Sequence, residues 1–120
     1  MFKVGDRVWL KEQKKVAEIS LITKPHSTQY YMKDMQGFWF EDEITQSADS
    51  MFEELGYEKE EDLKNDRIIY RWRDSLETIF SLKEKEMWLE RIGDMSGEYI
   101  LEIKEHLAIH QKLIELGWIE

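Results

Sequence analysis

The sequence predicts an α+β protein in which a small antiparallel β-barrel is followed by a helix, an antiparallel β-meander and a C-terminal helix. Three observations predict this class. Short alternating segments separated by turns fill the first 46 residues, residues 67–73 alternate cleanly between apolar and charged, and the motif Glu-Leu-Gly-aromatic occurs at residues 54–57 and 115–118. We therefore expect a barrel over residues 1–46 and an α+β domain over residues 47–120.

Four short strands are expected in the first part, at residues 7–10, 16–22, 28–33 and 38–40. Their β-branched and aromatic residues favour strands. Residues 34–37 form a turn, in which Gly37 suits a positive φ, and residues 41–44 form a helical turn. Four short strands do not build a flat sheet with a substantial core, so they predict a barrel.

The opening VGDRVW at residues 4–9, followed by VAEI at residues 16–19, resembles the start of small barrels of the Src-homology-3, KOW and Tudor type. In those barrels the first strand pairs with a second strand after a short loop. The resemblance covers about residues 2–44 and implies the same barrel here.

The repeated motif predicts the ends of two helices, at residues 51–55 and 104–116. Gly56 and Gly117 suit the left-handed position after the last turn. Tyr57 is expected to fold back on Phe52, and Trp118 on the apolar residue five positions before it. Ser47 or Asp49 is expected to cap the first helix.

Residues 67–73 predict the clearest strand, with three apolar side chains on one face and three arginines, Arg67, Arg71 and Arg73, on the other. Further strands are expected at residues 76–82 and from residue 87. Residues 99–103 predict either a fourth strand or the lead into the last helix. Residues 58–66 are very acidic and lack a strand pattern.

The blocks MFEELGY at residues 51–57, IIY at residues 68–70 and HQKLIELGW at residues 110–118 resemble a group of uncharacterised proteins encoded by phages and prophages of Gram-positive bacteria. That resemblance implies a small accessory phage protein and carries no assigned activity.

The composition restricts the function. The chain has no Cys, which excludes disulfides, thiolate catalysis and Cys-based zinc sites. It has no signal-peptide core and no apolar run long enough to span a membrane, so we expect a cytoplasmic protein. The net charge of −9 falls within residues 49–120, which disfavours broad nucleic-acid binding by that part.

Trp9, Tyr31 and Trp39 are candidate contact residues, because the first part has more rings than a small barrel can bury. If Phe38 and Phe40 point inward, alternation places Trp39 outward. Three interpretations stay open: the rings cover the junction with the second part, they bind a protein partner, or they stack on bases beside nearby lysines.

The acidic residues Glu58, Glu60, Glu61 and Asp62 form a second candidate contact site. A solvated charge run is the simplest interpretation, and a hard-cation site or mimicry of a phosphate backbone are the alternatives. The arginine row opposes mimicry, since it is expected to pair with glutamates across the sheet.

His106 and His110 are spaced i, i+4 and are the weak candidates for a metal site. Helical projection places them inside an apolar stripe, and a third ligand could only be His26, Glu102 or a distant carboxylate. A structural role is therefore favoured over a pH-sensitive or metal-binding one, and no metal or cofactor is expected. The chain also lacks a phosphate-binding loop and a nucleophile motif.

We therefore predict a non-enzymatic phage accessory protein that binds an unknown host or phage protein, for example by inhibiting a host or defence protein. A nucleic-acid module that uses the aromatic and lysine face of the barrel ranks second, and a purely structural role ranks third. A free strand edge leaves homodimerisation open.

Overall fold

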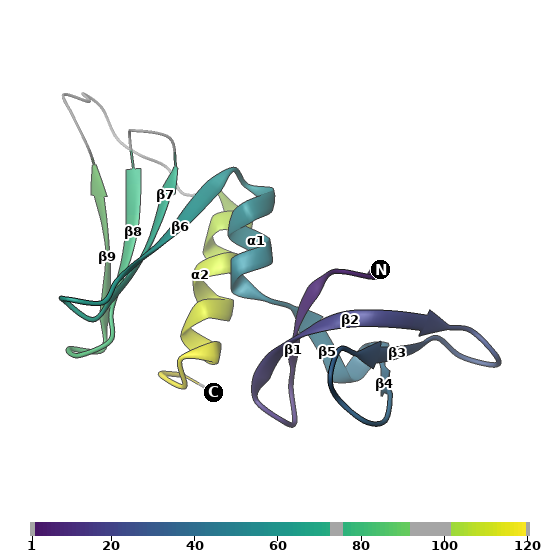
Figure 1. Ribbon diagram of the computed structural model, residues 1–120. Coiled ribbons are helices and arrows are strands. Elements are labelled where there is room, and N and C mark those ends of the chain that lie inside the picture. Colours follow the sequence, from purple (N-terminus) through teal and green to yellow (C-terminus); the bar gives the residue numbers. More distant parts are fainter. Residues whose placement is uncertain (1, 73–75, 92–101, 120) are drawn as a thin grey trace. The chain divides into compact units, whose positions relative to one another are not determined.

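The computed structural model describes residues 2–72, 76–91 and 102–119. It confirms the α+β class and contains two compact units, shown together in Figure 1. Unit 1 comprises Met1–Ser50 and Gln111–Glu120, and unit 2 comprises Met51–His110. The domain boundary after residue 46 stays a prediction, since compactness alone does not define a folding unit.

Unit 1 is built on a five-stranded antiparallel sheet in the order β4-β3-β2-β1-β5. Its elements are β1 (Arg7–Leu10), β2 (Lys15–Thr23), β3 (Gln29–Met32), β4 (Trp39–Phe40), the 3₁₀ turn η1 (Glu41–Glu43) and β5 (Ile44–Gln46). Four of the strands and the helical turn were predicted, whereas β5 was not. The described strands do not close into a barrel, because β4 and β5 end the sheet on opposite sides.

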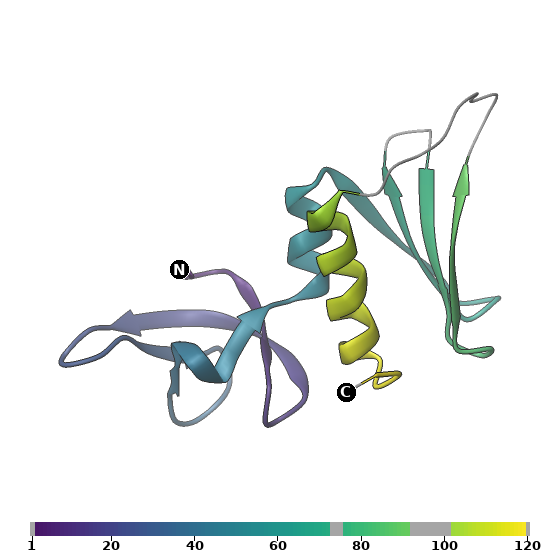
Figure 2. The ribbon, with the colours of Figure 1, turned by 180° about the vertical axis from the view of Figure 1, so that it is seen from behind.

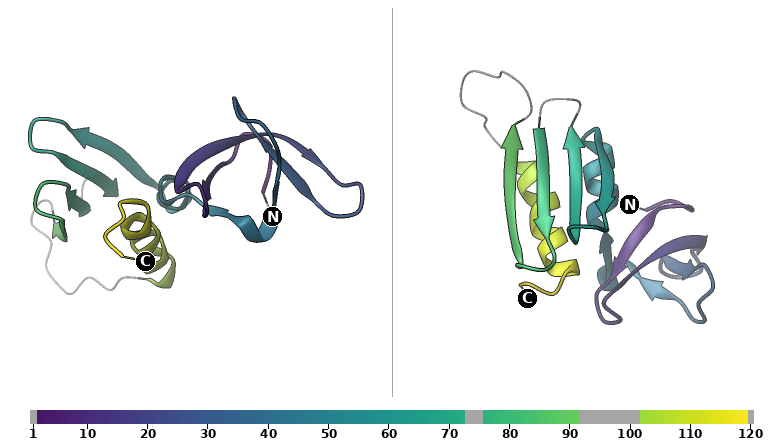
Figure 3. Two further views of the ribbon diagram at one scale, coloured as in Figure 1. Left: turned by 90° about the horizontal axis from the view of Figure 1, so that it is seen from below. Right: turned by 60° about the vertical axis from the view of Figure 1, so that its left-hand side comes forward.

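The long strand β2 holds this sheet together. It pairs with β1 through its first half and with β3 through its second half, and the register shifts between Ile19 and Leu21. Such an irregularity bends a strand. The purple and blue strands of unit 1 accordingly curve around a shared interior in Figure 3 (left), and β2 spans this unit in the view of Figure 2.

The core of unit 1 lies on the inner side of these strands. Seven buried side chains form it: Val8, Leu10, Ile19, Tyr30, Met32, Trp39 and Ile44. Val8 and Leu10 alternate along β1 and are fully buried. Burial of such apolar side chains from consecutive strands is the main source of stability of this unit.

Trp39 belongs to this core, so its predicted outward orientation is wrong. Its side chain is only 6% exposed, while Phe38 and Phe40 are 45% and 40% exposed. Trp39 is paired with the buried Tyr30 across β3 and β4, and paired residues share a face of the sheet. The sequence offers three rings in succession, so alternation alone did not decide which of them face inward.

Unit 2 contains a four-stranded antiparallel meander in the order β6-β7-β8-β9. Its strands are β6 (Tyr57–Asp62), β7 (Arg67–Trp72), β8 (Leu76–Ser81) and β9 (Glu86–Arg91). An antiparallel meander was predicted, with strands that correspond to β7, β8 and β9 but without β6. The sheet is seen face-on in Figure 3 (right), with helical segments on one side only. Arg73 and residues 99–101, where a further strand was considered, lie outside the described residues.

The acidic segment is the first strand of this sheet, so the prediction that it lacks a strand is wrong, whereas its residues 58–61 are exposed, as expected of a solvated charge run. Each residue of β6 pairs with a residue of β7, from Tyr57 with Trp72 to Asp62 with Arg67. Its charges suit an edge strand, because charged side chains discourage pairing with another chain. The opposite edge of the described sheet is β9.

Two helices complete the structure, α1 (Ala48–Glu54) and α2 (Ile103–Glu115). Both end as the repeated motif predicts, with Gly56 at φ +91° and Gly117 at φ +75°. The Phe52 and Tyr57 rings meet edge to face with centroids 5.2 Å apart, which confirms the predicted contact. None of the helices in the described part of the chain is long and apolar enough to span a membrane.

Packing in unit 2 centres on Phe52 of α1. Its ring stacks on Tyr70 of β7 with centroids 3.9 Å apart, and Tyr70 meets Phe80 of β8 edge to face. Stacked and edge-to-face rings add to the free energy of apolar burial. The predicted inward face of the clearest strand is thereby confirmed.

The buried face of α2 is more polar than its sequence suggests. Glu105, Ala108, Gln111 and Lys112 are buried, while Ile103 and Leu107 are exposed. Buried polar side chains require hydrogen-bond or ion-pair partners. Within unit 2 the Tyr57 hydroxyl donates a hydrogen bond to Glu105. Within unit 1 Lys112 forms an ion pair with Asp49 at 3.8 Å. The predicted apolar stripe of this helix is therefore wrong over its first half.

Candidate functional site

Three aromatic side chains of unit 1 form an exposed group on β3, β4 and the residue before β4. We call this group, Tyr31, Phe38 and Phe40, the aromatic row. Tyr31 and Phe38 have ring centroids 6.0 Å apart, and Phe38 and Phe40 are 5.4 Å apart and edge to face. Rings in mutual contact lose little further conformational entropy when a partner covers them, which suits a binding surface.

The sheet fixes the direction of these rings. Trp39 points into the core, so Phe38 and Phe40 on either side of it point outward. Leu21 is paired with Tyr31 across β2 and β3 and is also exposed, which extends the apolar surface. The Tyr31 hydroxyl donates a hydrogen bond to the Gln29 side chain at 3.3 Å.

Beside the aromatic row is a shallow hollow that carries negative charge. Its lining consists of Ser27, Thr28, Phe40, Glu41 and Asp42. The backbone N–H of Phe40 donates a hydrogen bond to the Glu43 carboxylate at 2.9 Å, which fixes the turn that bears these acids. An apolar ring next to two carboxylates favours a ligand group that is both apolar and positively charged.

The charge of this turn also acts on the core. Burial raises the pKa of the Tyr30 phenol above its ordinary value, and the negative charge of Glu41 raises it further. Tyr30 is thus held in its neutral form, in which it acts as part of the hydrophobic core.

The structure places the sequence-predicted contact residues in separate places. Tyr31 is half-buried in the aromatic row. Trp39 is in the core, where its indole N–H donates a hydrogen bond to Gln13 at 3.1 Å. Trp9 is 7% exposed and lines a groove of unit 1 that includes residues from the C-terminal segment.

The predicted acidic contact residues lie on β6 and face two ways. Glu58, Glu60 and Asp62 alternate with Lys59 and Glu61 along the strand. Glu61 forms an ion pair with Lys59 at 3.3 Å. The side-chain hydrogen bond from Asn65 lowers the pKa of Asp62, so this carboxylate is ionised and held in the β6–β7 turn.

Of the two described members of the arginine row, Arg71 pairs with glutamates, as expected. Arg71 contacts Glu77 at 2.7 Å and Glu60 at 2.8 Å. The side-chain hydrogen bond with Glu77 raises the pKa of the Arg71 guanidinium. Arg67 instead lies over the Trp88 ring, 5.2 Å from its centroid. At least Glu60 therefore has a structural partner in the sheet.

His106 and His110 are exposed, so their predicted place inside an apolar stripe is wrong. Across residues 2–72, 76–91 and 102–119, no three His, Cys, Asp or Glu side chains gather in a way that could hold a metal ion. The i, i+4 spacing alone supplies two ligands, and zinc sites use at least three from the protein.

Sequence reasoning missed Phe38 and Phe40 as surface residues. No local signal in the sequence identified them, because the pairing of Trp39 with Tyr30 of β3 decides which of the three rings faces inward. The largest of the three, Trp39, belongs to the core. Comparisons of the chain with protein-family models, curated proteins and solved structures find no match.

Proposed function

We propose that this protein acts by binding a partner protein, without catalysis, and that the aromatic row of unit 1 is the contact surface. The observation that carries the proposal is the outward orientation of Phe38 and Phe40, which are 45% and 40% exposed and contact each other. Contiguous exposed rings are typical of the energetic centre of protein interfaces.

A protein partner is favoured over nucleic acid by the charges beside the row. The described lining of the hollow at Phe40 includes Glu41 and Asp42 and no Lys or Arg. Phosphate groups would be repelled there, whereas stacking modules for single strands place cations along the backbone path. The same carboxylates favour a partner surface that presents apolar groups flanked by Lys or Arg.

We further infer that unit 1 is an opened relative of the small barrels that its first residues resemble. Three features support this inference: β1 pairs with both β2 and β5, β2 bends at an irregular register, and a 3₁₀ turn leads into β5. The binding surface then lies on the outer face of β3 and β4.

The identity of the partner is proposed from the resemblance to phage and prophage proteins alone. A small accessory protein of that kind would act in the cytoplasm of a bacterial host, on a host or defence protein. The acidic residues Glu58, Glu60, Glu61 and Asp62 are proposed as a second contact region for a basic surface of that partner.

Site-specific photo-crosslinking tests the proposal. The photoreactive residue p-benzoylphenylalanine would replace Phe38 or Phe40 in the host cell, and a matched control would replace Leu63, an exposed apolar residue of unit 2. We expect the same protein to be crosslinked from positions 38 and 40 and not from position 63. Crosslinks to nucleic acid at both positions, or no adduct at either, would contradict the proposal.

A further inference from the structure

A groove of about 640 Å³ lies in unit 1, and its lining shares no described residue with the hollow beside the aromatic row. Its lining comes from β1, the β1–β2 hairpin, β5 and the C-terminal segment: Trp9, Lys11, Lys14, Thr45, Gln111, Ile114, Gly117 and Ile119. This volume is within the range of about 300–1,000 Å³ that is usual for sites of small ligands.

The floor of the groove is apolar and well supported. Trp9 alternates with the core residues Val8 and Leu10, so its ring points to the other face of β1. Its neighbours across the sheet are Val16 and Thr45. Ile114 and Ile119 add aliphatic surface from the C-terminal segment.

The side of the groove formed by the C-terminal segment is fixed by two backbone hydrogen bonds. The backbone N–H groups of Gly117 and Trp118 donate to the carbonyls of Ile114 and Leu113, at 2.9 and 3.0 Å. A side chain at Gly117 would meet no atom within 4 Å, so the surface there is open. The wall is therefore preformed, which lowers the entropic cost of binding a ligand.

The polar side of the groove is positively charged. Lys11 and Lys14 are the charged residues of its lining within the part of the chain that the structure describes, in a chain with 17 Lys and Arg against 26 Asp and Glu. Lys14 has a left-handed backbone conformation with φ 55°. Its backbone N–H donates a hydrogen bond to the Leu10 carbonyl at 2.8 Å, which fixes the β1–β2 hairpin. Lys11 donates a hydrogen bond to the carbonyl of Asp42 at 3.0 Å.

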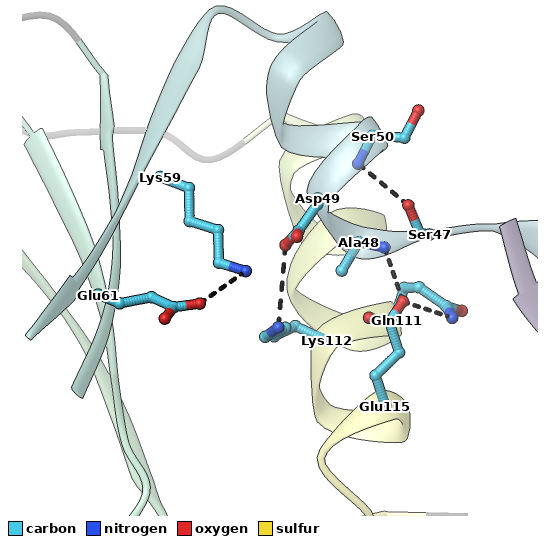
Figure 4. Close-up of polar contacts among 9 residues, drawn as sticks. All are labelled: Ser47, Ala48, Asp49, Ser50, Lys59, Glu61, Gln111, Lys112 and Glu115. Atoms are coloured by element: carbon cyan, nitrogen blue, oxygen red, sulfur yellow. Dashed lines mark hydrogen bonds and ion pairs between the residues drawn. The ribbon is translucent and has the colours of Figure 1, made fainter. Parts of the chain in front are cut away.

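The acidic residue that follows Ile114 in the helix has hydrogen-bond partners of its own. This residue is Glu115, and its carboxylate accepts hydrogen bonds from the backbone N–H of Ala48 and from the side chain of Gln111. Figure 4 shows these contacts. The groove thus combines an aromatic and aliphatic floor with two lysines among its described lining residues.

We propose that this groove binds a small apolar carboxylate, whose hydrocarbon part packs on Trp9, Ile114 and Ile119 and whose carboxylate pairs with Lys11 and Lys14. An ionised carboxylate accepts charge-assisted hydrogen bonds from two ammonium groups. A planar ring stacks well on the indole ring of a tryptophan. This site is separate from the aromatic row and does not depend on the proposed function.

Titration followed by two-dimensional ¹H–¹⁵N NMR tests the proposal, with indole-3-propionate as the probe and its uncharged amide as the matched ligand. The Trp9 indole N–H signal, assigned with Trp9→Phe, is the reporter. We expect the carboxylate to shift this signal at concentrations of about 1 mM and the amide to bind about 5–10-fold more weakly, as the loss of one partly exposed charge pair implies.

Two lysine variants locate the site. Lys14→Gln should weaken binding of the carboxylate by about 3–10-fold, whereas Lys24→Gln, an exposed lysine outside the groove, should leave it unchanged. Both variants keep the surrounding backbone, and unchanged spectra of the core residues verify the fold. Equal binding of acid and amide, equal effects of the two variants, or no shift of the Trp9 signal would each overturn the proposal.

Discussion

The carboxylate of Glu115 accepts a hydrogen bond of 2.7 Å from the backbone N–H of Ala48, the first residue of α1. The residues are 67 positions apart in the sequence, and both belong to unit 1. Ser47 caps the same helix, since its hydroxyl accepts a hydrogen bond from the Ser50 N–H at 3.2 Å. Glu115, the glutamate of the second Glu-Leu-Gly-aromatic motif, thus supplies a hydrogen-bond acceptor to the N-terminus of α1 (Figure 4).

Removal of this carboxylate should destabilise the protein. Glu115→Ala leaves a helix N-terminal N–H without its acceptor and removes a negative charge from the positive end of α1. We expect the free energy of unfolding to fall by about 1–2 kcal/mol. Urea denaturation measures it, and Glu12→Ala, at an exposed hairpin position, should change it by less than about 0.5 kcal/mol. Equal effects of the two substitutions would show that Glu115 does not support α1.

The stacked ring of Phe52 should be essential to unit 2. Phe52→Ala removes the contacts with Tyr57 and Tyr70 and leaves a cavity in the core. We expect a loss of about 3–5 kcal/mol in the free energy of unfolding. Phe38→Ala removes an identical side chain from the surface and should cost less than about 1 kcal/mol. If both substitutions cost the same, the assignment of one ring to the core and the other to the surface is wrong.

Alkaline pH should destabilise the protein through Tyr30. The pKa of this phenol is raised in the folded state, so the unfolded chain releases its proton first as the pH rises. The stabilisation that the neutral phenol provides is complete below the unfolded pKa of about 10 and is lost as the pH rises through the higher folded value. Denaturation midpoints between pH 9 and about pH 11 measure the effect.

Tyr30→Phe serves as the matched variant for that measurement. It keeps the ring and removes the ionisable group, so the alkaline decline in stability should be smaller than in the wild type. Tyr31→Phe, whose ring is half-buried at the surface, should leave the decline unchanged. A steeper decline in Tyr30→Phe than in the wild type would contradict the raised pKa.

The pairing of Arg71 with Glu77 should stabilise the meander modestly. A double-mutant cycle of Arg71→Met and Glu77→Gln should give a coupling energy of about 0.5–1 kcal/mol, because the guanidinium is partly exposed and screened by solvent. The coupling should fall in 1 M salt. The more exposed pair Lys59 and Glu61 should couple more weakly, and a stronger coupling there would contradict the ranking.

The helix ends could be predicted from the sequence because their causes are local. A glycine with positive φ and an aromatic residue after it specify the end of α1 and of α2 within one turn of chain. The alternation of β7 is equally local, since Tyr70 and its neighbours repeat with a period of two residues.

The orientation of Trp39 and the strand character of β6 could not be predicted, because both depend on residues distant in the sequence. Trp39 faces inward because Tyr30 opposite it does. The acidic β6 is extended because β7 pairs with it along its whole length and supplies Arg71 to Glu60. The groove is lined by residues from 9–14 and from 111–119, and no local sequence pattern predicts such a site.

The most direct test of the proposed function is the affinity of the crosslinked partner for variants of the aromatic row. Calorimetry would compare the wild type with Phe38→Ser/Phe40→Ser and with Leu63→Ser. We predict that the double variant loses at least about 30-fold in affinity, equal to about 2 kcal/mol, as expected when two rings at the centre of an interface are removed. Leu63→Ser should bind as the wild type does. Unchanged affinity of a correctly folded double variant would contradict the assignment of the aromatic row as the binding surface.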